Sequence, residues 1–282
     1  MRGPVVPDGR ALAREREGPL RARALRVGRG RGRPPRLLLV AFGGPGGGAP
    51  FLEGKRRACR ACGVEPVLLV LDPGAGTADV CRELLDAMAR EDPDGVFVQF
   101  PFPRGVDGEA VAALIPPERD VDVMSPAAMA RYLAGAGAAP PVTAAAVLAL
   151  LDHAGVALEG RAGVVVGDPI PYHELFREAL ARRGAAMEPV VSPDAPEVEE
   201  VLGRSDLVVV SAARAGWIPT SWFARGAVVV DAGYFNPGGR GDVDTTPGVD
   251  HLAVLVPVPG GVGPMTVSAL VEAVIQAAER GV

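Results

Sequence analysis

Short apolar runs alternate with longer amphipathic stretches along most of the 282-residue chain. In the first half, the pattern predicts strands over 37–42, 67–71 and 96–99, and helices over 51–62 and 77–90. Strands separated by helices of this length pair in parallel and carry helices on the faces of the sheet. The pattern therefore predicts an α/β fold.

A second α/β unit follows a Gly- and Ala-rich stretch at 133–139, which Pro140 and Pro141 close. The elements predicted beyond it are a helix from Thr143 to about His153, strands over 163–166, 207–210 and 228–230, a helix over 175–180, and a final helix from Thr266. We therefore predict two domains, which are residues 1–138 together with the last helix, 266–282, and residues 139–265.

Composition and charge narrow the class of protein. No run of about 18 apolar residues occurs, and charged sequence follows Met1 where a signal peptide would be apolar. The net charge of −5 argues against a nucleic-acid partner. Three cysteines are too few for a disulfide framework and suit a reducing compartment. We expect a cytoplasmic protein with neither a membrane nor a nucleic-acid partner.

Cys59 and Cys62 form a C-x-x-C pair, which is compatible with redox chemistry or with half of a zinc site. No second pair of cysteines or histidines completes a metal cage, and the surrounding segment is predicted as a helix. We therefore interpret the pair as two small helix residues and expect no metal.

Lys55 is the only lysine in the chain, since every other basic side chain apart from the histidines is arginine. A lysine near an apolar cleft can lose its proton, whereas arginine cannot, so Lys55 is a candidate for proton transfer. A solvated lysine beside Arg56 and Arg57 is the alternative.

Two further polar positions are candidates for binding or catalysis. Gln99 ends a strand that the pattern predicts to be buried, where an amide needs hydrogen-bond partners. Asp120 and Asp122 follow a charged turn, and a carboxylate there can accept two parallel hydrogen bonds from an amidine edge. Either aspartate can equally be a turn cap.

Three segments carry a family resemblance: 95–103 (GVFVQFPFP), 117–122 (PERDVD) and 256–266 (VPVPGGVGPMT). In this order and spacing they closely resemble the bifunctional methylenetetrahydrofolate dehydrogenase/methenyltetrahydrofolate cyclohydrolase family. The resemblance extends over nearly the whole chain, from Asp8-Gly9-Arg10 to the last helix. It implies an N-terminal catalytic domain that binds folate, with the C-terminal helix packed back on it, and a Rossmann-like nucleotide domain. It also implies a homodimer.

The resemblance assigns roles to particular residues. Lys55 takes the place of the catalytic lysine, Gln99 that of the glutamine that tunes it, and Asp122 that of the aspartate that binds the pterin. The substrate-binding residues that it implies are Phe51, Asp122, Pro259, Gly260, Gly261 and Pro264. Lys55 would then take and return the proton of a water that attacks the methenyl carbon.

The chain departs from the family pattern around the folate. Phe51 replaces a tyrosine and keeps the ring without the hydroxyl, and Gly48 replaces a serine. Val123 stands where the family has a glycine, and Ala128 where it has an asparagine. These changes reshape the rim of the predicted pocket.

The loop predicted to bind the nucleotide departs further from the family pattern than the residues around the folate do. The family reads roughly Gly-Arg-Ser-x-x-Val-Gly-x-Pro, and residues 167–175 here read GDPIPYHEL. Gly167 persists, Asp168 places a negative charge where the family has its arginine, and His173 adds bulk where close approach needs glycine. Pro169 and Pro171 each remove an N–H donor. Gly167, Asp168 and His173 thus form a degenerate cofactor site, and binding of NADP or NAD is doubtful.

His173 can also be considered as a base or metal ligand, but His153 and His251 give no ligand spacing with it. We expect it to be a helix residue that faces solvent.

Three functional hypotheses follow. The first is a methenyltetrahydrofolate cyclohydrolase whose NADP-dependent dehydrogenase activity is weakened or lost. The second is an intact bifunctional enzyme that uses NADP or NAD. The third is a repurposed or non-catalytic folate-binding relative, which the changes at Gly48, Phe51 and Ala128 suggest.

Overall fold

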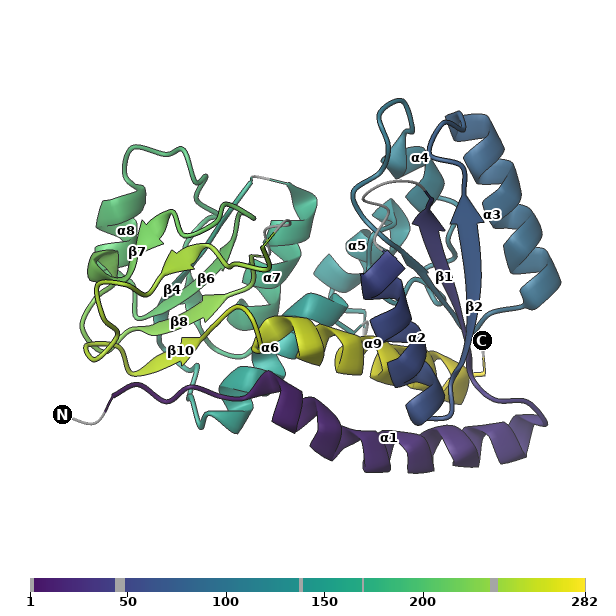
Figure 1. The fold of residues 1–282 in the computed structure, drawn as a ribbon, viewed down its shortest axis with the longest axis horizontal. Helices are drawn as coiled ribbons and strands as arrows, with labels where there is room; N and C mark the ends of the chain where they lie inside the picture. The colour runs from purple at the N-terminus through teal and green to yellow at the C-terminus, as the bar shows by residue number, and fades with distance from the viewer. Residues whose placement is uncertain (1–2, 44–48, 137–138, 169, 234–237, 282) are drawn as a thin grey trace. The chain divides into compact units, whose positions relative to one another are not determined.

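The computed structural model describes residues 3–43, 49–136, 139–168, 170–233 and 238–281, which form two compact units (Figure 1). The N-terminal unit contains residues 14–142 and 267–282, and the C-terminal unit contains residues 1–13 and 143–266. Each unit has its own parallel sheet, so the predicted two-domain α/β fold is confirmed. Within the described residues, no helix is long and apolar enough to cross a membrane.

The N-terminal unit is built on three parallel strands in the order β2-β1-β3. Leu37 to Ala41 of the central strand are at most 1% exposed, which is the pattern of a strand with both faces covered. The strands are β1 (Arg36–Phe42), β2 (Glu65–Leu71) and β3 (Gly95–Val98), and the helices are α2 (Ala49–Ala61), α3 (Thr77–Glu91), α4 (Gly108–Ala112) and α5 (Pro126–Leu133).

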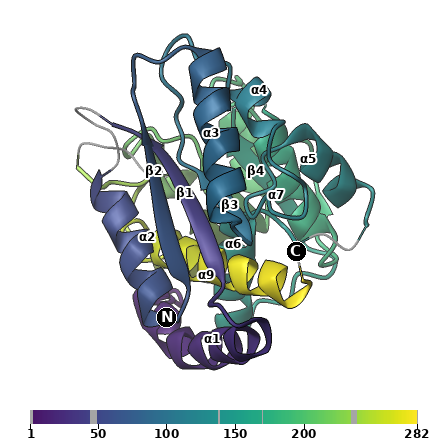
Figure 2. The ribbon, with the colours of Figure 1, turned by 90° about the vertical axis from the view of Figure 1, so that its right-hand side faces the viewer.

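The long helices α1 (Gly9–Arg31) and α9 (Val262–Glu279) lie side by side in this unit (Figure 2). Arg23 pairs with Glu272 and Glu279, each at 2.8 Å. Helix α9 also packs on the start of β3, because a side chain at Gly95 would lie 3.1 Å from Val274 Cγ2. The C-terminal helix therefore packs on the N-terminal domain, as the resemblance implies.

The predicted start of this last helix is wrong. Helix α9 begins at Val262, and Thr266 lies inside it, where its Oγ1 donates to the Val262 carbonyl at 3.1 Å. Pro264 lies in the first turn of α9. The N–H groups of a first turn have no acceptor within the helix, so a proline, which lacks this group, is compatible with the earlier start.

The C-terminal unit has a five-stranded parallel sheet in the order β10-β8-β6-β4-β5. Valine triplets fill its central strands and are fully buried. The elements are α6 (Val142–His153), β4 (Ala162–Gly167), α7 (Pro171–Ala181), β5 (Ala186–Met187), α8 (Val198–Arg204), β6 (Leu207–Ser211), β8 (Val228–Asp231) and β10 (Val254–Val256). A small pair, β7 (Ile218–Pro219) with β9 (Val243–Asp244), and the 3₁₀ helix Thr220–Trp222 complete it.

Two buried carboxylates hold the loops that follow β6 and β8. Asp242 accepts hydrogen bonds from the backbone N–H groups of Ala212, at 2.7 Å, and Ala213. Asp231 accepts from Gly233 and Val243, and burial raises the pKa of its carboxyl to about 7. These bonds fix the carboxyl-terminal edge of the sheet.

Residues 3–13 pack with the C-terminal unit, whereas the predicted N-terminal domain includes them. Val5 pairs with Val254, through hydrogen bonds of 2.9 Å and 3.0 Å to the neighbouring backbone. Gly9 meets the backbone of Gly261 so closely that a side chain has no room there. The first and last motifs of the family resemblance thus touch each other.

Asp8 caps helix α1, since its Oδ1 accepts from the backbone N–H groups of Arg10 at 2.8 Å and Ala11 at 3.0 Å. We expect Asp8→Ala to lower the free energy of unfolding by about 1 kcal/mol, because these N–H groups lose their acceptor. Urea denaturation measures the change. Glu15→Ala, at an exposed position of the same helix, is the control, and an equal loss there would contradict the assignment.

Candidate functional site

The lone lysine is buried, and this excludes the solvated alternative. The Lys55 side chain extends from α2 and is 6% exposed. Its Nζ donates a hydrogen bond of 2.8 Å to Oε1 of Gln99, the residue that follows β3. Nζ also lies 5.0 Å from the centre of the Phe97 ring. The structure therefore brings together the two residues that the sequence analysis singles out for catalysis.

Gln99 is held in turn by the backbone carbonyl groups of two other residues. Its Nε2 donates to the Phe100 carbonyl at 2.9 Å, and its backbone N–H donates to Val40 at 2.8 Å. The amide therefore presents its oxygen, and not its nitrogen, to Lys55.

Burial lowers the pKa of the Lys55 ammonium from 10.5 to about 8, while the negative charge of Asp122 partly opposes this effect. About one tenth of the lysine is then neutral at pH 7, and half of it at pH 8. A group that titrates in this range can both accept and return a proton near neutral pH.

This pKa predicts a pH dependence. A base acts in its neutral form, so we expect kcat/KM for hydrolysis of a methenyl-folate to rise from pH 6, to reach half of its maximum near pH 8 and to level off above about pH 9. The profile is measured by the loss of methenyl-folate absorbance, with the uncatalysed rate subtracted. A rate that is constant between pH 6 and 8 would contradict a role for neutral Lys55.

The two aspartates of the 117–122 motif do different things. Asp120 is structural, because its Oδ2 accepts from the backbone N–H of Ser125 at 2.6 Å and so shapes the turn before α5. Asp122 is also buried, and its Oδ1 accepts from the backbone N–H of Val142 at 3.1 Å. Of the two aspartates, Asp122 and not Asp120 raises the pKa of Lys55 through its charge. The cap interpretation therefore fits Asp120.

Val123 has a positive φ of 56°, in the left-handed region that favours glycine. The family resemblance implies a glycine at this position, and a glycine would adopt this φ without strain. A left-handed conformation costs a residue with a side chain about 1–2 kcal/mol. The packing that buries Val123 must offset this cost.

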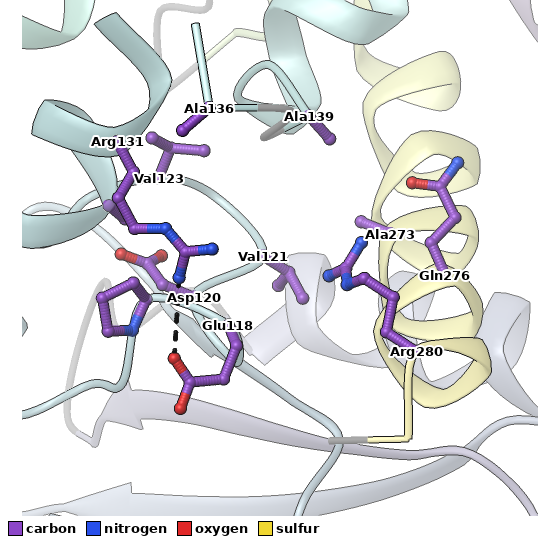
Figure 3. A pocket seen from close by; sticks show the side chains of 12 residues that line it. Glu118, Asp120, Val121, Val123, Arg131, Ala136, Ala139, Ala273, Gln276 and Arg280 are labelled. Atoms are coloured by element: carbon purple, nitrogen blue, oxygen red, sulfur yellow. Dashed lines mark ion pairs between the residues drawn. The ribbon is translucent and has the colours of Figure 1, made fainter. Parts of the chain in front are cut away.

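Other residues of the 117–123 segment line a cavity of about 200 Å³ (Figure 3). Asp120, Val121 and Val123 line it, together with Gln276 and Arg280 of α9. Arg131 and Glu118 face each other across 3.8 Å at its edge. Lys55, Gln99 and Asp122 are not among its twelve lining residues, so this cavity is separate from the lysine site.

The other predicted folate contacts belong to other segments of the chain or lie outside the described residues. Gly48 lies outside the described residues, and so does the side chain of Phe51. Pro259, Gly260 and Gly261 form the turn between β10 and α9 in the C-terminal unit, and Pro264 lies in the first turn of α9. Gly260 has a φ of +105°, which only glycine adopts without strain. Contact of these residues with a folate stays a prediction.

The predicted exposure of His173 is wrong. The residue is 5% exposed, because Nδ1 bonds to the Asp168 carbonyl at 2.5 Å and the ring covers Gly167 at the end of β4. Asp168 itself is exposed, and Pro169 lies outside the described residues. Sequence periodicity gave no signal for this contact.

Redox or metal chemistry at the cysteines is disfavoured. Burial raises the pKa of the Cys59 thiol to about 12 and that of Cys62 to about 11, so neither forms a thiolate near neutral pH. Across the described ranges, no three His, Cys, Asp or Glu side chains are placed to hold a metal ion.

Sequence models of two protein domains match this chain. Residues 8–122 match the catalytic domain of tetrahydrofolate dehydrogenase/cyclohydrolase, and residues 141–282 match its NAD(P)-binding domain. The chain belongs to the tetrahydrofolate dehydrogenase/cyclohydrolase family. Membership of this family makes the chain an enzyme of one-carbon folate metabolism. It has a catalytic domain and a domain of the NAD(P)-binding type.

Named relatives agree over almost the full length. The chain is 32% identical to the bifunctional protein FolD of Acidobacterium capsulatum over 278 residues, with 98% of each chain covered. It is 37% identical to the bifunctional protein FolD 1 of Saccharopolyspora erythraea over 250 residues, with 87% and 85% covered. Among solved structures, the dehydrogenase-cyclohydrolase of Trypanosoma brucei, in complex with NADP and an inhibitor, has a TM-score of 0.91 at 30% identity, covering 100% and 99%.

Proposed function

We propose that the chain hydrolyses a methenyltetrahydrofolate at the Lys55 site, as a cyclohydrolase. The observation that carries the proposal is the buried lysine, whose pKa is lowered to about 8, bonded to Gln99 at 2.8 Å. Such a lysine serves proton transfer and is expensive to bury for packing alone. The intact pair argues against the non-catalytic hypothesis.

The reaction needs one base that later acts as an acid. A water attacks the methenyl carbon, forms a C–O bond and gives its proton to neutral Lys55. The protonated lysine then returns this proton to the folate nitrogen as the C–N bond breaks. The remaining hydroxyl proton is lost to solvent as the C=O bond of the formyl group forms. Gln99 accepts a hydrogen bond from Nζ and so fixes the direction of the lysine throughout.

Asp122 supplies the binding of the pterin in this proposal. Its carboxylate is buried and close enough to act on Lys55, so a pterin held there would bring its one-carbon unit toward the lysine. A charge-assisted hydrogen bond to the amidine edge is worth about 1.5–3 kcal/mol.

The second candidate is the bifunctional enzyme with an NAD(P)-dependent dehydrogenase. The comparisons favour it over loss of that activity, because the relatives named above are bifunctional and the Trypanosoma brucei structure contains NADP. Weakened dehydrogenase activity finds no support in them and stays a prediction from residues 167–175.

One experiment with two assays separates the candidates. Purified protein is tested for loss of methenyl-folate absorbance without nucleotide, and separately for NADPH or NADH formation from methylene-folate. We expect hydrolysis in the first assay. Its absence would overturn the cyclohydrolase proposal, whereas strong reduction of nucleotide in the second would establish the bifunctional enzyme.

We also propose a homodimer, by analogy with the family. Light scattering coupled to gel filtration should then give about twice the chain mass of 29.0 kDa.

A further inference from the structure

The ends of β4 and β6 form a topological switch point in the C-terminal sheet. The chain leaves β4 for β5 on one side and later returns to β6 on the other, as the strand order β10-β8-β6-β4-β5 shows. Open α/β sheets bind ligands outside the carboxyl ends of their strands at such a point, and dinucleotides place their pyrophosphate there. Gly167 and Ser211 are the last residues of these two strands and pair in register.

The imidazole of His173 spans this position. A Cβ atom on Gly167 would lie 2.5 Å from its Cε1 and 2.6 Å from its Nδ1, so the ring fills the space that the glycine leaves open. Nε2 lies 3.2 Å from Oγ of Ser211 at the end of β6. One side chain therefore closes the crevice from one strand end to the other.

The ring is held by both of its nitrogens. The Asp168 carbonyl can only accept, so Nδ1 carries a proton and donates it at 2.5 Å. Nε2 is occupied by the Ser211 hydroxyl. The Phe176 ring lies 6.2 Å from the imidazole, centre to centre, in edge contact. The orientation of His173 is thus fixed by the fold of the turn.

The backbone of the turn is also a poor partner for phosphate. The N–H of Gly167 donates to Val191, that of Ile170 to Asp168, and that of His173 to Ile170. Pro171 has no N–H, although it stands at the first position of α7, where a helix usually offers donors to an anion. Asp168 adds an exposed carboxylate beside them. The residues present do not fit a dinucleotide pyrophosphate.

We propose that the His173 side chain occupies the pyrophosphate position of the dinucleotide site, so that NADP or NAD can be seated only when the imidazole leaves Gly167 and Ser211. His173 is then the residue that sets the affinity of this domain for dinucleotides. The cofactor class comes from the family, and the inference does not depend on hydrolysis at Lys55. The nucleotide-free hydrolysis assay tests that proposed function separately.

The test is calorimetry with NADP and with NAD on the full chain and on His173→Gly, His173→Ala and His251→Ala. His251 is a matched control, since it lies in the same unit and its Nε2 bonds to the Thr220 carbonyl at 2.9 Å. We expect no binding to the parent or to His251→Ala below about 1 mM, and at least about tenfold tighter binding to both His173 variants. Thermal melting checks that each variant is folded.

A second measurement needs no variant. In the parent with isotope-labelled histidine, the His173 ring resonances should move only at millimolar NADP, when the ring is displaced. Micromolar binding to the parent, or His173 variants that bind no more tightly than the parent, would overturn the proposal. A His173 ring resonance that stays constant while NADP binds would overturn the proposal as well.

Discussion

Replacing Lys55 by methionine is expected to lower turnover of a methenyl-folate by a factor of about 10² to 10⁴, which is the usual contribution of a general acid–base group. Methionine has an unbranched apolar side chain one atom shorter than that of lysine, but it cannot carry a proton, and it leaves Gln99 without its donor. Binding of the folate should change by less than about tenfold, because Asp122 provides most of the recognition. Steady-state kinetics and calorimetry measure the two effects.

The neighbouring residue supplies the control. Arg57 lies two positions further along α2 and is exposed, so Arg57→Met removes a positive charge from the same helix without touching the site. Its turnover should equal that of the parent. If Lys55→Met also retained parental turnover, the lysine would have no part in the mechanism.

Asp122→Ala is expected to weaken binding of the folate by about 1.5–3 kcal/mol, or roughly ten- to a hundredfold. The amidine edge loses a charged acceptor, and the backbone N–H of Val142 loses its partner at the same time. The measurement is calorimetry in a Lys55→Met background, where the ligand is not consumed. Affinity equal to that of the background protein would place the pterin elsewhere.

A matched variant separates this role from a purely structural one. Asp122→Asn keeps an oxygen for Val142 but removes the charge that raises the pKa of Lys55. The rising part of the pH–rate profile should therefore move to lower pH in the asparagine variant. A profile that does not move, with a lowered melting temperature, would show that Asp122 only supports the fold.

The strands could be predicted from sequence because both faces of each parallel sheet are buried. Valine and leucine runs such as 37–41 and 208–210 leave a signal that needs no tertiary information. The start of α9 could not be predicted, because Gly263 and Pro264 suggest a turn when helix propensity alone is considered. The packing of residues 3–13 could not be predicted either, since Val5 pairs with a strand almost 250 positions away in the sequence.

Some residues of the candidate site could likewise be predicted from sequence, and others could not. Lys55 could be singled out from composition, and its pairing with Gln99 from the family resemblance. The burial of His173 could not, because it depends on three tertiary partners, Gly167, Asp168 and Ser211, on two strands and a turn. A glycine at a strand end is compatible with an open ligand site and with a neighbouring side chain that fills it.

Because Lys55 is the only lysine in the sequence, it can serve as an intrinsic spectroscopic probe of the site. Since Lys55 carries the only side-chain ammonium group, isotope-labelled lysine yields a single side-chain signal, and that signal reports the proton on Nζ directly as pH is varied. The N-terminal amine is the only other primary amine, so a reagent selective for neutral amines modifies at most two positions. A folate bound at Asp122 would shield the amine of Lys55 from the reagent. The fraction of protein left unmodified at Lys55, measured by mass spectrometry, would then give the occupancy of the site without any substrate turnover.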